Sequence, residues 1–131
     1  NAEIAAAADI YLLSQYGRGD ERLAGRVRAM IRPLLAVGRC GNEHVATALA
    51  LHPRTMHRRL ALEGARFDDI KDEVRREMAE ILIRQPGLSM TQIASALGYA
   101  EQSALSRSCV RWFGSSPRAL RQMATDRHAM P

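Results

Sequence analysis

The stretch from Ser89 to Arg121 limits the possible folds more than any other part of the chain. Ser89 and Gln92 have the spacing of a capping box, in which each side chain bonds the other residue's backbone amide at a helix start. Gly98 then interrupts the apolar helical pattern, because glycine adopts the left-handed conformation of a tight turn without steric penalty. A second amphipathic helix follows and ends at Gly114. Two short helices joined by a tight turn, the second exposing amide, hydroxyl and guanidinium groups, predict a helix-turn-helix.

The same apolar framework occurs earlier in the chain. At an offset of 48 residues, Val45, Ala46 and Leu49 correspond to Ile93, Ala94 and Leu97. In the helix that follows, the offset is 49, and Met56, Arg58 and Leu60 correspond to Leu105, Arg107 and Cys109. The turn of the second copy is therefore one residue longer. Ala50-Leu51 stands where the second copy has Gly98-Tyr99, and His52-Pro53 predicts a helix that starts with proline.

Helical periodicity predicts the elements outside the two copies. Apolar steps of three and four predict a helix from Asp20 to about Gly38, with a kink or irregular turn at Pro33. Asn42 is expected to cap the first helix of the earlier copy. A final short helix is predicted to begin at Pro117.

A long helix is predicted between the two copies. Its inner face has residues that repeat at helical spacing: Phe67, Ile70, Val74, Met78, Ile81 and Leu82. Charged residues, including Arg75 and Arg76, fall on the outer faces, where mixed charge normally meets solvent. Such a helix is roughly 25 Å long, so it can serve as a rigid spacer between two recognition helices about one DNA turn apart.

The predicted class is all-α, with about seven helices that form two helix-turn-helix subdomains joined by a long linker helix. The expected organisation is a separate helical segment over 1–19, a DNA-binding domain over 20–124, and a frayed tail over 125–131. Within the domain we expect the first helix-turn-helix at 42–63, the linker helix at 67–84, the second helix-turn-helix at 89–113 and the final helix at 117–123.

Composition points to a nucleic-acid partner. The 131-residue chain has a net charge of +5, and Lys71 is the only lysine among its 19 basic residues. Arginine suits phosphates and guanine edges better than lysine does, although a GC-rich genome would also favour it. No run of apolar residues is long enough for a membrane span and no signal segment is evident, so we expect a cytoplasmic protein without membrane contact. Cys40 and Cys109 do not indicate a disulfide framework.

The second helix-turn-helix resembles the signature of the AraC/XylS family of bacterial transcription regulators. The matching residues are Ile93-Ala94, Leu97-Gly98-Tyr99, Ser103, Ser106-Arg107, Arg111-Trp112, Gly114, Ser116-Pro117 and Arg121. The chain departs from the family at five positions, where the family usually has phenylalanine for Leu105 and Cys109, a basic residue for Val110, an aromatic for Leu120 and serine for Ala100.

The resemblance implies a DNA-binding domain of a regulator, more often an activator than a repressor. It also implies contact with RNA polymerase and a separate N-terminal domain that senses a small-molecule effector or mediates dimerisation. Residues 1–19 are interpreted as the end of that domain or the linker after it. The partner expected for this chain is double-stranded promoter or operator DNA.

Matching the family's motif residue by residue assigns the contacts to DNA bases. The base-contacting set is Arg54, His57 and Arg58 on the first recognition helix and Gln102, Ser103 and Arg107 on the second. Arginines and hydroxyl groups suit phosphate oxygens, which gives a separate phosphate-contacting set: Thr55, Thr91, Ser106, Arg111 and Arg118. Arg59 and Arg121 are suited equally to phosphate contacts and to ion pairs with the acidic linker helix.

Other chemistry is less well supported by the residues. The aromatic residues Phe67, Tyr99, Trp112 and Phe113 have the spacing of core residues rather than of a base-stacking platform. Cys40 and His44 alone do not make a zinc site, nothing gathers Ser, His and Asp around a pocket, and no metal, cofactor or catalytic activity is expected. Two alternatives remain open: a basic helical module that binds an acidic protein, and the DNA-recognition part of a larger DNA-modifying enzyme.

Overall fold

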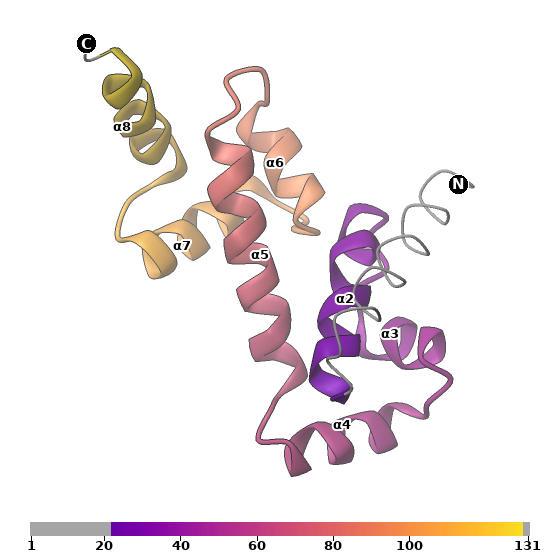
Figure 1. Cartoon of the computed structure of the whole chain (residues 1–131). Coiled ribbons are helices and arrows are strands. Elements are labelled where there is room, and N and C mark those ends of the chain that lie inside the picture. Colours follow the sequence, from indigo (N-terminus) through magenta and orange to yellow (C-terminus); the bar gives the residue numbers. More distant parts are fainter. Residues whose placement is uncertain (1–21, 130–131) are drawn as a thin grey trace. The chain divides into compact units, whose positions relative to one another are not determined.

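The computed structural model describes residues 22–129, which form seven α-helices and no β-strand. In chain order (Figure 1) they are α2 (Leu23–Ala36), α3 (Asn42–Ala48), α4 (Pro53–Leu62), α5 (Phe67–Ile83), α6 (Met90–Ala96), α7 (Gln102–Phe113) and α8 (Pro117–Ala129). The chain divides into two compact units: unit 1 ends at Val74 and unit 2 begins at Arg75, so each takes one half of α5. Residues 1–19, for which an interdomain helix is expected, lie outside the described residues.

Unit 1 is built from α2, α3 and α4, which pack on one another, and the first half of α5. Its largest fully buried side chains are Leu23, Val27, Ile31, Leu35, Val45, Met56 and Leu60. The carboxylate of Glu63, just after α4, accepts hydrogen bonds from the backbone N–H groups of Leu23 at 2.8 Å and Ala24 at 2.9 Å. Because the first N–H groups of a helix lack partners within it, Glu63 caps α2 and ties α4 to that helix.

The helix starts in unit 1 show one difference from the sequence-based expectation. The predicted capping role of Asn42 is wrong: Asn42 is the first helical residue of α3, and the N-cap position is Gly41, which makes no side-chain cap bond. The start of α4 does follow the expected His52-Pro53 pattern. His52 is the N-cap residue, and its Nδ1 accepts a hydrogen bond from the backbone N–H of Arg54 at 3.1 Å.

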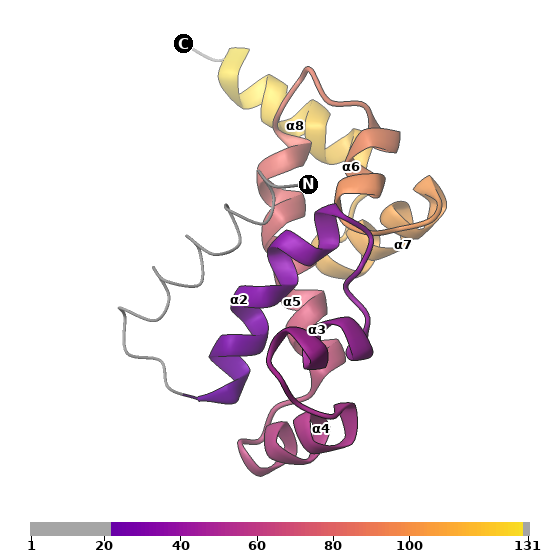
Figure 2. The same cartoon turned by 90° about the vertical axis from the view of Figure 1, so that its right-hand side faces the viewer.

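Unit 2 contains the second half of α5 with α6, α7 and α8 (Figure 2). Its buried core is one cluster: Ala79, Ile83, Met90, Ile93, Ala94, Leu97, Leu105 and Cys109. The predicted capping box is confirmed, because Ser89 Oγ accepts from the Gln92 N–H at 3.0 Å and Gln92 Oε1 accepts from the Ser89 N–H at 2.8 Å. Tyr99, Trp112 and Phe113 are partly buried against this core, as their spacing predicts.

Three other regions differ from expectation or extend it. Ile81, predicted on the inner face of α5, is 55% exposed, and Ala79 and Ile83 are buried instead. The final helix does not end near Met123: α8 continues to Ala129, into the segment expected to fray. Helix α2 continues through Pro33 to Ala36. Within residues 22–129, no helix combines the length and the apolar character that crossing a membrane requires.

Candidate nucleic-acid interface

Helix α4 presents the proposed base-contacting residues of unit 1 on its outer face. Arg54, His57 and Arg58 are exposed, whereas Met56 and Leu60 on the opposite face are fully buried. Residues three and four apart share one face of a helix, so the three exposed side chains form one polar surface. Among the described residues, the guanidinium groups of Arg54 and Arg58 make no hydrogen bond or ion pair, which leaves their donors available.

His57 is held more firmly than an isolated surface histidine. Its ring lies edge-on to that of Phe67, the first residue of α5, with 6.2 Å between the ring centroids and 73° between the ring planes. Phe67 is itself buried. The His57 imidazole remains exposed while one side is supported by the core, so it is pre-positioned beside Arg54 and Arg58.

Helix α7 presents the corresponding set in unit 2. Gln102, Ser103 and Arg107 are exposed, and Leu105 and Cys109 beneath them are fully buried. Gln102 is the first residue of the helix, where a recognition helix usually meets base edges. Arg107 corresponds to Arg58 in the sequence repeat, and its guanidinium also makes no bond within the described part of the chain.

The polar side chains at the start of α7 are linked to one another and to α6. Thr91 Oγ1 donates to Gln102 Oε1 at 3.4 Å, and this hydrogen bond joins the start of α6 to the start of α7. Ser103 Oγ donates to Glu101 Oε2 at 3.1 Å. No sequence pattern singles out Glu101, whose carboxylate places a negative group beside the proposed base-contacting residues of α7.

The proposed phosphate-contacting residues lie on several elements. Thr91 is exposed on α6, Thr55 is half-buried on α4, and Arg118 is exposed in the first turn of α8. Arg111 is exposed near the end of α7, with its guanidinium carbon 5.4 Å from the centroid of its neighbour's indole ring. Ser106 Oγ donates to the carbonyl of Gln102 at 3.3 Å, so its hydroxyl proton is already engaged.

Two arginines serve as structural clamps. Arg121 donates through Nε to the carbonyl of Ile83 at 2.9 Å and through Nη2 to that of Gln85 at 3.0 Å, which caps the end of α5. Its role is therefore internal, although its partners are carbonyls rather than the carboxylates considered from the sequence. Arg75, expected on a solvated face, donates to the carbonyls of Leu97 and Gly98 in the turn between α6 and α7. No sequence signal pairs these positions, because the partners are backbone groups of distant residues.

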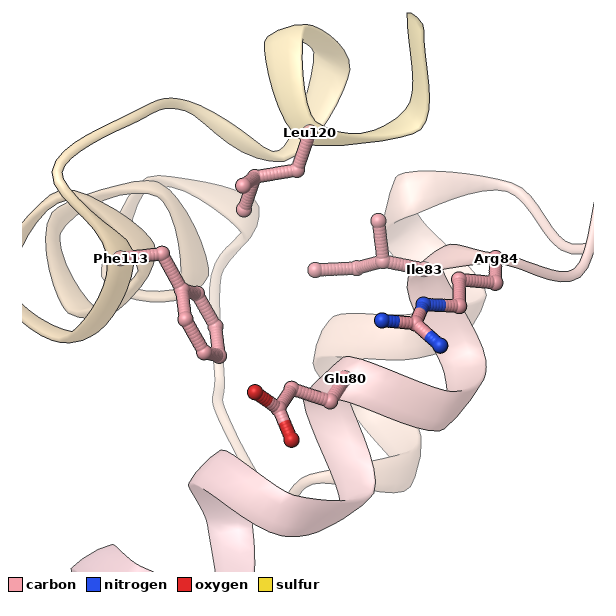
Figure 3. A pocket seen from close by; sticks show the side chains of 5 residues that line it. All are labelled: Glu80, Ile83, Arg84, Phe113 and Leu120. Carbon is pink, nitrogen blue, oxygen red and sulfur yellow. The ribbon is translucent and has the colours of Figure 1, made fainter. Parts of the chain in front are cut away.

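A small cavity of about 100 Å³ lies between α5, α7 and α8 in unit 2 (Figure 3). Its walls are Glu80, Ile83, Arg84, Phe113 and Leu120. Figure 3 shows the Leu120 side chain pointing into the gap between Phe113 and Ile83. Leu120 is the position where an aromatic residue is expected from the resemblance, and a larger side chain there would extend into this space.

The two cysteines are buried thiols. Cys40 Sγ donates to the carbonyl of Ile31 at 3.7 Å, and Cys109 lies within the core of unit 2. Burial raises the pKa of the Cys109 thiol from 9.0 to about 11. In the described region, no group of three or more His, Cys, Asp or Glu side chains is arranged to hold a metal ion.

Comparison with known proteins gives a consistent family. A helix-turn-helix domain model matches residues 45–123, which covers both turns and the helix between them. The HTH-type transcriptional regulator VirS of Mycobacterium tuberculosis is 51% identical over 111 residues, or 85% of this chain. Those residues are 33% of VirS, so the chain spans about a third of the length of this relative.

Solved structures have the same fold. A DNA-binding transcriptional dual regulator from Escherichia coli K-12 superposes with a TM-score of 0.75 at 20% identity, over 82% of this chain and 96% of that one. The C-terminal domain of AraT, a response regulator from Geobacillus stearothermophilus, superposes with a TM-score of 0.67 at 26% identity, over 77% and 84% of the two chains. Both alignments extend well beyond a single helix-turn-helix.

Proposed function

Because this chain belongs to the AraC/XylS-type helix-turn-helix family of transcription regulators, we propose that it is a domain that binds specific DNA sequences, with α4 and α7 entering two successive major grooves. The observation that carries the proposal is the repeated unit. In each copy an apolar face is fully buried, and the opposite face of the second helix exposes arginine. Arg54 and Arg58 on α4 and Arg107 on α7 make no hydrogen bond or ion pair among the described residues. Exposed guanidinium groups on a helix that follows a tight turn suit the major groove of DNA.

Each recognition helix carries side chains that match particular base edges. Arg54 and Arg58 on α4 and Arg107 on α7 are suited to bidentate bonds with guanine, and Gln102 to adenine. His57 and Ser103 add single hydrogen bonds. Each good bidentate pair is worth about 1–3 kcal/mol of discrimination against a wrong base.

Phosphate contacts fix the register of the domain on the duplex. Arg111 and Arg118 supply charge, and Thr55 and Thr91 supply hydroxyl donors. Ser106 joins this set by moving its hydroxyl proton from the Gln102 carbonyl to a phosphate oxygen. If about six phosphates are neutralised, affinity falls with salt at a log–log slope of about −5.

The length of α5 suits two binding boxes about one helical turn apart. The helix has 17 residues, which corresponds to roughly 25 Å. With the turns at its ends, it is a spacer of the order of the 34 Å or so that separates successive major grooves. Unit 1 would then read one box and unit 2 the other.

The wider role extends beyond this chain. We propose that the whole protein is an activator that contacts RNA polymerase in the cytoplasm and responds to a small-molecule effector through another domain. Family membership supports this regulatory role rather than an enzymatic one. The relatives' additional length supports the presence of a further domain.

Selection from random duplexes tests the proposal. The purified protein is incubated with random-sequence DNA at about 150 mM salt, where weak electrostatic binding is largely screened. The expected product is a motif of two short boxes whose centres are about 10 base pairs apart. The contrary result is that no sequence is enriched, that binding to all duplexes falls equally as salt rises, and that heparin binds the protein as strongly as DNA does. The helices would then form only a basic surface without sequence preference.

A further inference from the structure

The turn between α6 and α7 is held by a side chain from another helix. Arg75, at the middle of α5, donates through Nε to the carbonyl of Leu97 at 2.8 Å and through Nη2 to that of Gly98 at 3.3 Å. Leu97 is the C-cap residue of α6, and Gly98 has the left-handed backbone of the turn, with φ of 77°. One planar guanidinium therefore binds two successive carbonyls of the turn.

The same guanidinium also contacts the next residue. Its central carbon lies 4.3 Å from the centroid of the Tyr99 ring, which is the geometry of a cation–π contact. The Tyr99 hydroxyl is 2.7 Å from Oγ of Ser108, a buried residue of α7. A continuous set of contacts thus runs from α5 through three residues of the turn into α7.

The equivalent position in unit 1 cannot form these hydrogen bonds. At the repeat offset of 48 residues, the position of Arg75 corresponds to Val27, which is fully buried in the core of unit 1. A valine side chain cannot donate a hydrogen bond to a turn carbonyl. Among the residues that the structure describes, these arginine bonds to the turn therefore belong to unit 2, whose turn is also one residue longer than that of unit 1.

We propose that Arg75 is a positioning residue for DNA reading by unit 2: it fixes the turn between α6 and α7 and thereby sets the orientation of α7 in its groove. This inference rests on the proposed function, because it concerns base reading by α7. Gln102 begins α7 only three residues after Tyr99, so a shift of the turn moves Gln102 directly. Base discrimination depends strongly on such placement, since a bidentate bond needs both donor and acceptor in register.

The test compares Arg75→Lys and Arg75→Met with Arg76→Ala in the full chain. Arg76 is the adjacent arginine; it is exposed, and its guanidinium carbon lies 5.8 Å from the Phe113 ring centroid rather than at the turn. For each variant, affinity is measured for the duplex selected by the wild-type protein and for duplexes with either box replaced. Circular dichroism and thermal melting give the folded fraction, and affinities are corrected for it.

If Arg75 positions α7, its variants should lose base discrimination in one box only. Both Arg75 variants should lower discrimination between the selected and the replaced sequence at least tenfold in the box read by α7. Discrimination in the other box should stay unchanged. Arg75→Lys should show the same loss as Arg75→Met although it keeps the charge. Arg76→Ala should preserve discrimination in both boxes. Tyr99→Phe removes the hydroxyl link to Ser108 and should lower discrimination in the box read by α7 to a smaller extent. If the Arg75 variants do not fold, this variant still tests the inference.

Other outcomes overturn the inference separately from the proposed function. If the Arg75 variants, corrected for their folded fraction, discriminate between box sequences as well as the wild-type protein does, Arg75 only stabilises the fold. A salt slope reduced by about one in Arg75→Met and restored in Arg75→Lys would make it a phosphate contact. If the wild-type protein selects no boxes, the proposed function itself fails.

Discussion

Ala50 and Gly98 occupy equivalent places in the two turns, and both have a left-handed backbone, with φ of 57° and 77° respectively. Ala50 is the only residue other than glycine with positive φ among the described positions. A side chain in this conformation brings its Cβ too close to the following carbonyl, at a cost of about 1–2 kcal/mol. The first turn therefore retains its shape against a local penalty that the second turn does not have.

Replacing Ala50 by glycine should stabilise unit 1. Relief of the steric cost exceeds the extra entropy that glycine gives the unfolded chain, so Ala50→Gly is expected to raise the free energy of unfolding by about 0.5–1 kcal/mol. The reverse change, Gly98→Ala, should lower it by about 1 kcal/mol. Urea unfolding followed by circular dichroism measures both. A destabilised Ala50→Gly would show that the methyl group makes a contact worth more than the strain.

Filling the cavity beside Leu120 should also stabilise the protein. The Leu120→Phe ring can occupy the space of about 100 Å³ between Phe113 and Ile83, and cavity filling commonly adds about 0.5–2 kcal/mol. The control is Leu62→Phe, because Leu62 is 82% exposed and its replacement should leave the melting temperature unchanged. A lower melting temperature for Leu120→Phe would mean that Phe113 cannot adjust to a second ring.

Arg58 and Arg107 hold corresponding places on the two recognition helices and should act on different boxes. Arg58→Ala is expected to relax base preference in the box read by α4, and Arg107→Ala in the box read by α7, each by about 1–3 kcal/mol. Arg59→Ala provides the control, since Arg59 is an exposed neighbour of Arg58 that is not proposed to contact a base. Random-duplex selection with each variant shows the effect. Loss of both boxes from one substitution would contradict independent reading.

The buried thiol of Cys109 should make stability depend on alkaline pH. Burial raises its pKa to about 11, so between pH 9 and 11 the thiol ionises more readily in the unfolded chain than in the folded one. The contribution is fully present below pH 9 and is lost as the pH rises towards 11. Urea unfolding at several pH values should show this decline in the free energy of unfolding. In Cys109→Ala the free energy of unfolding should fall less steeply over the same pH range. Equal slopes for both proteins would exclude the thiol as the cause.

Local signals in the sequence predict much of the fold. The capping box at Ser89, the turn at Gly98 and the start of α4 after His52 depend on residues within a few positions, and the structure has all three. Periodicity was ambiguous where apolar residues are adjacent. Ile81, Leu82 and Ile83 follow one another, and the pattern alone could not show that Ile83 is buried while Ile81 is exposed.

Long-range polar contacts could not be predicted in this way. The hydrogen bonds of Glu63, Arg75 and Arg121 join groups between 22 and 40 residues apart, and each involves backbone atoms that carry no sequence information. The extension of α8 has a local cause that apolar periodicity misses. Gln122 Nε2 donates to Asp126 Oδ1 at 3.1 Å, one helical turn later, and supports the helix beyond Met123. The DNA-contacting residues remain predictions, from the family motif for the base contacts and from side-chain chemistry for the phosphate contacts.

Methylation interference on the selected duplex tests DNA reading by the two units most directly. Methylation of guanine N7 places a group in the major groove, where Arg58 and Arg107 are proposed to bind. We predict interference in two clusters about 10 base pairs apart, on one face of the duplex. Arg58→Ala should abolish one cluster and Arg107→Ala the other. A single cluster, or none, would contradict the insertion of two recognition helices into successive major grooves.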